Sequence, residues 1–335
     1  MATLKDVAQK AGVSSAAVSR ILNNDASLSV PPETRQKVLD AARELNYQKK
    51  SKGTAKSAYT MGILQWFSSL QELEDSYYLS IRQGIEDFCL ANCLNVVRTF
   101  KTDLNCMESL SQADGLICIG KFTADEVASF KEITDSLLLI DMASPDPEVS
   151  SITPDFEQAV SEALDYLYRL GHRDIAYLGG LEYLADGSLF PDSRCAAFTA
   201  YCESHGINYL PYMKEEQFSS ESGYRMMTEL IESGSLPSAV FAASDPIALG
   251  ALNAAKEQGL KVPGDLSFIG FDDISLCRMA SPPLTTVHAP VYEMGQYGAG
   301  IVYHLLKTPS DAALQIKIPC RLALRNSCRE KKDGK

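Results

Sequence analysis

The stretch TLKDVAQKAGVSSAAVSRILNN, residues 3–24, decides the fold of the N-terminal part of the chain. Thr3 is a suitable N-cap for a helix whose apolar residues recur at spacings of three and four. Gly12 is expected to end that helix, since glycine readily adopts the left-handed conformation found after helices. Ser14 then caps a second short helix over residues 15–22. The pattern predicts two helices joined by a tight turn.

A third amphipathic helix, predicted over residues 32–46, supplies the apolar face that the first two helices need. The second helix then exposes Ser15, Ala16, Ser19 and Arg20. Small side chains beside an arginine suit a helix inserted into the major groove, where arginine binds guanine. The sequence therefore predicts an all-α helix-turn-helix domain with double-stranded DNA as its partner.

Charge is divided unevenly along the chain, whose net charge is −12. Residues 1–58 contain ten Lys or Arg and five Asp or Glu, a net charge of +5. The totals of 31 basic and 43 acidic residues leave 21 and 38 for residues 59–335, a net charge of −17. This split favours a polyanion partner for the N-terminal part alone. Chance clustering of charge on a solvated face would explain the split equally well by itself.

Length and composition indicate a soluble protein of two or three domains, with 335 residues of which 45% are hydrophobic. The nine cysteines are scattered without metal-site spacing, so we expect reduced thiols and no bound metal. The N-terminus lacks a signal-peptide-like apolar run, and no window approaches eighteen uninterrupted apolar residues. We expect a cytoplasmic protein that requires no cofactor and does not associate with membranes.

The rest of the chain alternates strand-like and helix-like segments. Strands are predicted at 61–66, 94–99, 115–119, 137–141, 175–178, 239–243 and 266–271. Amphipathic helices are predicted at 78–91, 156–170, 191–203, 223–231, 246–258 and 292–305. This alternation indicates parallel sheets covered by helices on both faces, and the length favours two such units. No GxGxxG or GxxxxGK[ST] motif is present, which argues against a nucleotide-phosphate site.

The N-terminal stretch resembles the DNA-reading domain of the lactose/galactose repressor family of transcription regulators. The match includes Thr3-Leu4, Asp6-Val7-Ala8, Ala11-Gly12-Val13-Ser14, Val18-Ser19-Arg20, Leu22-Asn23, Thr34-Arg35, Val38 and Leu45-Asn46-Tyr47. The resemblance implies DNA-binding roles for Thr3, Ser14, Ser15, Ala16, Ser19, Arg20, Asn23 and Thr34. By this resemblance, Ser15 and Ala16 are expected to select the operator and Arg20 is expected to read a base. Thr3, Ser14, Ser19 and Asn23 are expected to contact phosphates or support the helix.

The segment after Tyr47, QKKSKGTAKSAYT, departs from the family pattern. Family members continue with a proline and a short hinge helix whose leucine wedges into the minor groove. This chain has Gly53 there, and no proline or leucine. We therefore expect a basic, flexible linker over residues 48–59. Its lysines are expected to contact the DNA backbone without a hydrophobic wedge.

The body of the chain resembles the same family over its whole length. Matching runs include Leu170-Gly171-His172, Ile175 to Gly180, Ser222-Gly223-Tyr224, Ala243-Ser244-Asp245, Gly270 to Asp273 and Pro282 to Val287. The resemblance implies a periplasmic-binding-protein-like core of two doubly wound lobes with an effector between them. It also implies an N-lobe of about 60–155 and 288–318, and a C-lobe of about 156–287 and 319–330.

The same resemblance implies effector-binding roles for Tyr77, Tyr78, Asp141, Arg194, Phe218, Ser244 and Asp272. In sugar-responsive members, the matching Arg and Asp grip hydroxyls and an aromatic ring stacks on the sugar. Paired hydrogen bonds and an aromatic plate are also what carbohydrate binding requires chemically. Tyr77 and Tyr78 are expected at the cleft entrance. Ser244 replaces an asparagine common in the family, which removes one expected contact.

Each of these residues also has a purely structural explanation. Asp272 and Asp273 would cap the next helix, Arg194 would form a surface ion pair, and Phe218 and the two tyrosines would pack in the core. His172 and His288 are interpreted as structural residues. The residues alone leave these alternatives open.

The sequence contains no assembled set of catalytic residues, so we expect a regulator and not an enzyme. A transporter's solute-binding protein would share the fold of the body but would carry a signal peptide and no DNA-reading domain. Three runs, at 71–74, 218–220 and 240–245, resemble family members that regulate β-galactosidase operons and favour a β-galactoside effector. Control by a protein partner or a non-sugar metabolite, as in the catabolite-control branch, is the alternative. A homodimer is expected, because one DNA-reading domain covers few base pairs.

Overall fold

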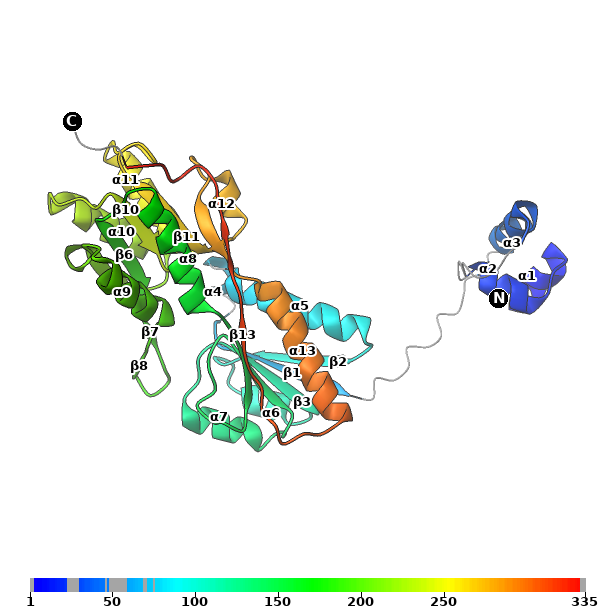
Figure 1. Ribbon diagram of the computed structural model, residues 1–335. Coiled ribbons are helices and arrows are strands. Elements are labelled where there is room, and N and C mark those ends of the chain that lie inside the picture. Colours follow the sequence, from blue (N-terminus) through cyan, green and yellow to red (C-terminus); the bar gives the residue numbers. More distant parts are fainter. Residues whose placement is uncertain are drawn as a thin grey trace. The chain divides into compact units, whose positions relative to one another are not determined.

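The computed structural model describes residues 3–22, 30–45, 47, 59–68, 71–74 and 76–331. The chain divides into two compact units, Met1–Lys56 and Ser57–Lys335, and the elements of both are labelled in Figure 1. Each unit has its own hydrophobic core, so each is described by itself.

The described part of the N-terminal unit contains three short helices, α1 (Leu4–Ala11), α2 (Ser15–Leu22) and α3 (Pro32–Glu44). Each helix buries one valine completely in the small shared core, namely Val7, Val18 and Val38. The arrangement confirms the predicted helix-turn-helix domain. The third helix ends at Glu44, before the predicted limit at residue 46.

Local side-chain chemistry sets the limits of the first two helices. The Thr3 hydroxyl accepts a hydrogen bond from the Asp6 N–H, and the Asp6 carboxylate accepts one from the Thr3 N–H. This reciprocal pair satisfies two backbone donors at the start of α1. Gly12 ends α1 with a φ of 69°, in the left-handed region. Ser14 accepts a hydrogen bond from the Ala17 N–H and so caps α2.

The described part of the second unit contains two six-stranded sheets, one in each lobe. The N-lobe sheet has the order β13 (Gln315–Ile318), β5 (Ser150–Pro154), β4 (Leu137–Ile140), β3 (Gly115–Ile119), β1 (Thr60–Gln65) and β2 (Asn95–Phe100). The C-lobe sheet has the order β14 (Arg321–Ala323), β12 (Thr285–His288), β11 (Ser267–Asp272), β10 (Ala239–Ala242), β6 (Ile175–Gly180) and β9 (Met213–Glu216). Every neighbouring pair is parallel except β12 with β14.

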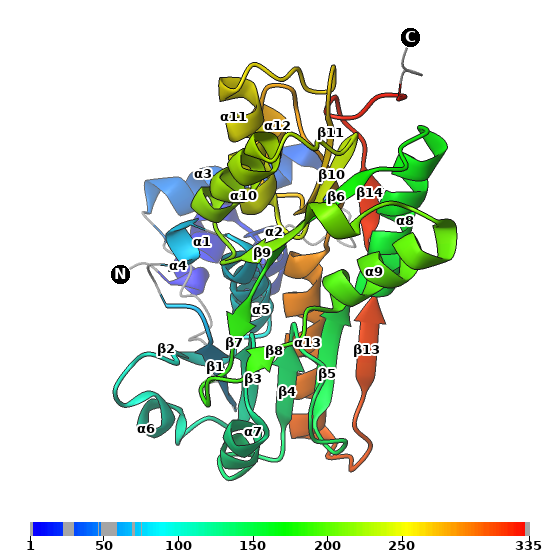
Figure 2. The same ribbon diagram turned by 90° about the vertical axis from the view of Figure 1, so that its left-hand side faces the viewer.

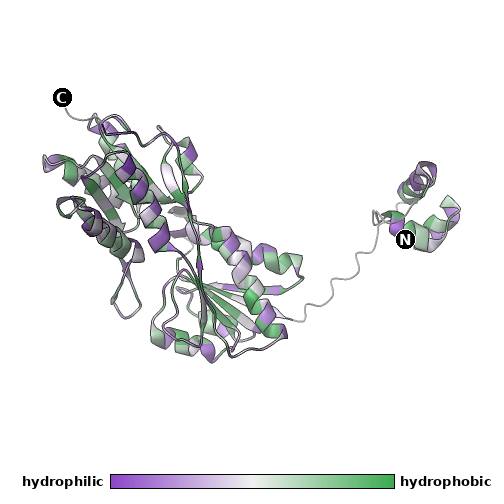
Figure 3. Ribbon diagram, viewed as in Figure 1, coloured by the Kyte–Doolittle hydropathy of each residue, from purple (hydrophilic) through white to green (hydrophobic). Residues whose placement is uncertain are grey.

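Helices cover both faces of each sheet. The N-lobe carries α4 (Gln71–Glu74), α5 (Tyr77–Ala91), α6 (Cys106–Leu110), α7 (Ala124–Lys131) and α13 (Val291–Lys307). The C-lobe carries α8 (Phe156–Arg169), α9 (Ser193–His205), the 3-10 turn Leu210–Tyr212, α10 (Ser220–Glu232), α11 (Asp245–Glu257) and α12 (Leu276–Met279). Figure 3 shows the strands as mainly hydrophobic and the helices as hydrophobic on one side. This burial on both faces confirms the predicted α/β core of two doubly wound lobes.

The chain passes between the lobes three times, between β5 and α8, between β12 and α13, and between β13 and β14 (Figure 1). Seven predicted strands and six predicted helices are present, each with ends within about three residues of the expected positions. A small antiparallel hairpin, β7 (Glu182–Tyr183) with β8 (Leu189–Phe190), follows β6 and was not predicted.

Close packing of α5 against α13 gives a test of the N-lobe. A Cβ atom at Gly295 would lie 2.0 Å from the Ile81 carbonyl oxygen, whereas one at Gly300 would lie 3.5 Å from the Phe88 ring. We expect Gly295→Ala to lower the free energy of unfolding by about 3 kcal/mol, because backbone must move. Gly300→Ala, on the same helix, should leave it unchanged or raise it by up to about 1 kcal/mol. Urea denaturation measures both, and equal effects would contradict this packing.

Candidate functional site

The outer face of α2 carries four of the residues predicted to read DNA. Ser15, Ala16 and Arg20 are exposed there and Ser19 is half-buried. Val18 and Ile21, on the opposite face, are buried against the other two helices. The fold therefore presents small side chains and one arginine together, as DNA reading requires.

The remaining predicted DNA contacts divide into two groups. The exposed Thr3 and Ser14 side chains cap α1 and α2, and Thr34 is half-buried in the first turn of α3. Asn23 and the linker residues 48–58, with their lysines, lie outside the described residues. The expected absence of a hinge wedge therefore stays a prediction.

All seven predicted effector residues line one cavity between the two lobes, which we call the chamber. Its complete lining is Phe67, Tyr77, Tyr78, Asp141, Glu182, Arg194, Phe218, Ser244 and Asp272. The first four residues belong to the N-lobe and the other five to the C-lobe. The free volume is about 30 Å³, which is room for water but not for a sugar ring. Entry of a ligand therefore requires side chains or lobes to move.

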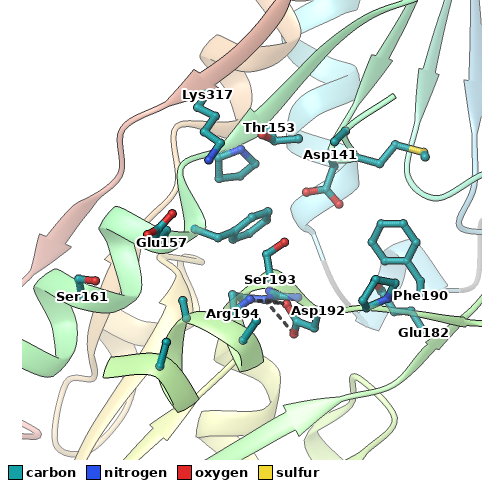
Figure 4. Close-up of a pocket in the computed structure, with 18 of the residues that line it drawn as sticks. Asp141, Thr153, Glu157, Ser161, Glu182, Phe190, Asp192, Ser193, Arg194 and Lys317 are labelled. Carbon is teal, nitrogen blue, oxygen red and sulfur yellow. Dashed lines mark hydrogen bonds and ion pairs between the residues drawn. The ribbon is translucent and has the colours of Figure 1, made fainter. Parts of the chain in front are cut away.

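A larger cavity of about 800 Å³, the outer cleft, adjoins the chamber. Asp141, Glu182 and Arg194 line both cavities. Figure 4 shows Asp141 on one side of the outer cleft and Ser193 and Arg194 on the other. The two cavities therefore adjoin at three charged side chains between the lobes.

Strand ends explain why these residues converge. Asp141 directly follows β4, Ser244 closely follows β10, Phe218 closely follows β9, and Asp272 ends β11. The carboxyl ends of parallel strands share one edge of a sheet, and ligands of α/β proteins bind at that edge. The two lobes turn these edges towards each other.

The carboxylate of Asp141 is held by three donors from the N-lobe. The Tyr77 hydroxyl donates to Oδ1 at 2.8 Å, and the Tyr78 hydroxyl donates to Oδ2 at 2.8 Å. The buried Lys121 ammonium donates to Oδ2 at 2.5 Å and also to the Asp141 carbonyl oxygen. Burial, and next the charge of Asp141, raise the pKa values of both tyrosines well above the usual range. The hydroxyls thus remain protonated donors, and Asp141 mainly positions this wall of the chamber.

Tyr77 and Tyr78 do not stand at the cleft entrance as expected. Both are buried, with 8% and 4% of their surfaces exposed, because they lie inside the interface between the lobes. The Phe67 ring packs edge-on against Tyr78, with ring centroids 4.5 Å apart. The tyrosines therefore both pack in the core and line the chamber.

Arg194 is fixed in the C-lobe by hydrogen bonds and aromatic rings. Its Nε donates to Asp192 Oδ1 at 2.9 Å, and its Nη1 donates to the Ala243 carbonyl oxygen at 2.7 Å. Three phenylalanine rings have centroids 4.9 to 5.5 Å from its guanidinium carbon, those of Phe156, Phe218 and Phe271. Only 12% of the Arg194 side chain is exposed, so the surface ion pair considered from sequence is wrong. The guanidinium is held rigidly at the chamber.

Phe218 and Ser244 have structural contacts besides lining the chamber. The Phe218 ring covers Gly180, where a Cβ atom would lie 2.1 Å from the ring. The Ser244 hydroxyl accepts a hydrogen bond from the Ile247 N–H and so caps α11. A change of orientation would therefore remove the packing of Phe218 on Gly180 or the cap that Ser244 provides to α11.

Asp272 and the next residue, Asp273, do not cap a helix, because α12 begins at Leu276 after Ser275. Their φ angles are 113° and 62°, in the region that non-glycine residues rarely adopt. Asp272 is buried at the chamber, while the Asp273 carboxylate pairs with Arg325. Such backbone strain is typical of functional sites.

Four residues near the chamber were missed by sequence reasoning, namely Phe67, Lys121, Glu182 and Asp192. Phe67 and Lys121 each come two residues after a parallel strand, and Asp192 caps α9 two residues before Arg194. Position after a strand would have been a usable signal for the first two. Glu182 lies on the unpredicted hairpin, and no sequence pattern indicated it.

The two histidines interpreted as structural have different surroundings. His172 is buried, with Nδ1 2.9 Å from the Ser238 hydroxyl and Nε2 3.1 Å from the Arg329 carbonyl oxygen. Burial lowers the pKa of His172, so it is neutral near pH 7. His288 is half-exposed, with Nδ1 3.2 Å from Asp273.

Within the part of the chain that the structure describes, no helix is long and apolar enough to cross a membrane. No group of His, Cys, Asp or Glu side chains among those residues is arranged to hold a metal ion. The nine cysteines are all free thiols.

Comparison with known proteins covers both units of the chain. Residues 3–50 match a family model described as bacterial regulatory proteins, lacI family, and residues 164–328 match a periplasmic binding protein-like domain. The chain is 36% identical over 332 residues to the HTH-type transcriptional regulator GalR of Streptococcus thermophilus. The alignment covers 98% of this chain and 99% of that protein. It is also 38% identical over 339 residues to the HTH-type transcriptional repressor MelR of Bacillus subtilis, and this alignment covers 98% of both proteins.

A solved structure of the lac repressor dimer bound to operator and the anti-inducer ONPF is also similar. Its TM-score is 0.69 at 27% identity, over 98% of this chain and 99% of that one.

The contacts of Asp141 give a test of the chamber's N-lobe wall. We expect Lys121→Met to lower the free energy of unfolding by about 3 kcal/mol or more, because the carboxylate would stay buried without its cation. Lys317→Met is the control, since Lys317 lines the outer cleft but forms no ion pair with the described residues. Urea denaturation at pH 7 compares the two variants. Similar small losses would contradict the assigned ion pair.

Proposed function

The chain belongs to the lacI family of bacterial regulatory proteins, and we propose that it represses a sugar-utilisation operon whose operator it releases when a β-galactoside binds between the lobes. It is a DNA-binding transcriptional regulator. The observation that carries the proposal is the convergence of aromatic, arginine and carboxylate side chains from both lobes in one chamber.

The chamber has the chemistry that a neutral sugar needs. Arg194 supplies a fixed planar donor, and Asp272 supplies a buried carboxylate. Phe67 and Phe218 add aromatic surface for the C–H face of a pyranose ring. Carbohydrate sites combine such groups, because paired hydrogen bonds replace those lost from water.

The β-galactoside assignment rests on sequence resemblance. The runs Gln71–Glu74, Phe218–Ser220 and Val240–Asp245 resemble the repressor of the evolved β-galactosidase operon. Two of these runs contribute a chamber residue, Phe218 and Ser244 respectively. We therefore propose lactose and related galactosides as the first ligands to test.

The DNA-bound form is proposed to be a homodimer on a palindromic operator. One α2 helix covers only a few base pairs, and two copies related by a two-fold axis would read two half-sites. The similar lac repressor structure is a dimer bound to its operator. Effector binding would change the relation between the lobes of each protomer and so the spacing of its recognition helices.

Arg20 tests the DNA-binding face. We expect Arg20→Ala to weaken binding to an operator, selected from random duplexes by the wild-type chain, by about a hundredfold, because each half-site loses a base contact. Arg43→Ala, which removes an exposed charge at the end of α3, should weaken it by less than about threefold. Fluorescence anisotropy at fixed salt measures both. Equal operator affinity in Arg20→Ala and the wild-type chain would remove Arg20 from the interface.

Asp272 tests the effector site separately. We expect Asp272→Ala to bind the operator as the wild-type chain does but to lose the response to lactose, because a sugar hydroxyl loses its acceptor. Asp311→Ala removes an exposed carboxylate and should respond normally. Operator anisotropy during a lactose titration distinguishes the variants. A normal lactose response in Asp272→Ala would exclude Asp272 from the site.

A further inference from the structure

The β7–β8 hairpin belongs to the C-lobe in sequence but contacts the N-lobe. It follows β6, and its second strand ends at Phe190, whose side chain packs against an N-lobe core cluster. The Lys121 ammonium lies 5.2 Å from the centroid of the Phe190 ring. Figure 2 shows the hairpin beside the ends of β3 and β4. The hairpin therefore bridges the two lobes next to the chamber.

Glu182 is the residue that pairs in register with Phe190 across this hairpin. Its side chain lines both the chamber and the outer cleft (Figure 4). Among the described residues, the Glu182 carboxylate has no hydrogen-bond or ion-pair partner. By contrast, the carboxylates of Asp141 and Asp192 are occupied by Lys121 and Arg194. Glu182 thus offers acceptor oxygens that no described protein donor uses.

We propose that Glu182 is a specificity-determining residue, whose carboxylate accepts a hydrogen bond from a hydroxyl of a neutral sugar and repels anionic sugars. This proposal rests on the function proposed above for the chamber. It adds the hairpin as the element that selects among ligands, because the docking of Phe190 on the N-lobe holds Glu182 at the junction of the two cavities.

The charges around the chamber agree with this role. Four carboxylates, those of Asp141, Glu182, Asp192 and Asp272, lie in or beside the chamber, against the two cations Lys121 and Arg194. Lys121 is bound to Asp141 and Arg194 to Asp192, so the surroundings keep an excess of negative charge. A phosphorylated or carboxylated sugar would therefore add negative charge to a site with excess acid. A neutral ligand with several hydroxyl groups meets no such repulsion.

Burial also favours the binding of a donor to Glu182. Burial raises the pKa of Glu182, whereas the positive charges of Lys121 and then Arg194 lower it, and the net shift is upward. A carboxylate that is partly removed from water and lacks a protein donor is stabilised by a hydroxyl that reaches it. Contact with the ligand would supply that donor.

The test compares galactose with galactose 6-phosphate, which differ only by the phosphate. Calorimetry on the full chain at pH 7.5 gives the ratio of the two affinities. We expect the wild-type chain to prefer galactose, and Glu182→Gln to shift the ratio towards the phosphate by about tenfold or more, because one like charge is removed at short range. Galactose itself should bind Glu182→Ala about tenfold more weakly, because a charge-assisted hydrogen bond is lost.

Asp186→Asn is the matched control, since it removes a charge from the same hairpin. Asp186 is exposed in the turn, where its carboxylate accepts hydrogen bonds from Ser188. Its affinity ratio should equal that of the wild-type chain. An unchanged ratio in Glu182→Gln, or an equal shift in Asp186→Asn, would overturn the role of Glu182 while leaving the proposed function intact. If the wild-type chain binds neither galactose nor lactose, the proposed function itself fails. Thermal unfolding of each variant confirms that the core is folded.

Discussion

The buried carboxylate of Asp141 is the constraint on which the arrangement of the interlobe site depends. A charge removed from water must be paired, and here Lys121, Tyr77 and Tyr78 together supply the donors. These contacts connect the ends of β3 and β4 to the start of α5, so one wall of the chamber is rigid. The opposite wall is organised in the same way, because Asp192 and the Ala243 carbonyl fix Arg194 among phenylalanine rings. Each lobe therefore prepares its half of the site independently.

A ligand binds most tightly when it contacts both the N-lobe wall and the C-lobe wall of the chamber. The chamber has little free volume, so binding and the relative position of the lobes must be coupled. The hairpin strengthens that coupling, because Phe190 rests on the N-lobe while Glu182 faces the ligand space. Under the proposed function, such coupling would convert sugar concentration into a change at the DNA-reading helices.

The helix-turn-helix and the central strands could be predicted from sequence because their signals are local. Caps such as Thr3 and a glycine such as Gly12 mark helix limits, and buried parallel strands are continuous apolar runs. The strands β5, β9, β12, β13 and β14 were not among the seven predicted strands. Three of them, β9, β13 and β14, lie at sheet edges, and the other two, β5 and β12, are short and contain Ser or Thr. The seven candidate effector residues and their expected roles came from family resemblance, but the contacts that hold their side chains in place did not. Lys121 binding to Asp141 and Glu182 facing the chamber depend on contacts between segments distant in sequence, and no local pattern encodes them.

In the proposed function, a neutral galactoside bound between the lobes controls the DNA-binding form of the protein. Operator affinity measured as a function of lactose concentration tests this control. Anisotropy of a labelled operator should therefore fall as lactose is added to the wild-type complex, with half-release at the concentration where calorimetry detects binding to the protein. Operator affinity that stays constant while lactose demonstrably binds, or an absence of lactose binding altogether, would contradict it.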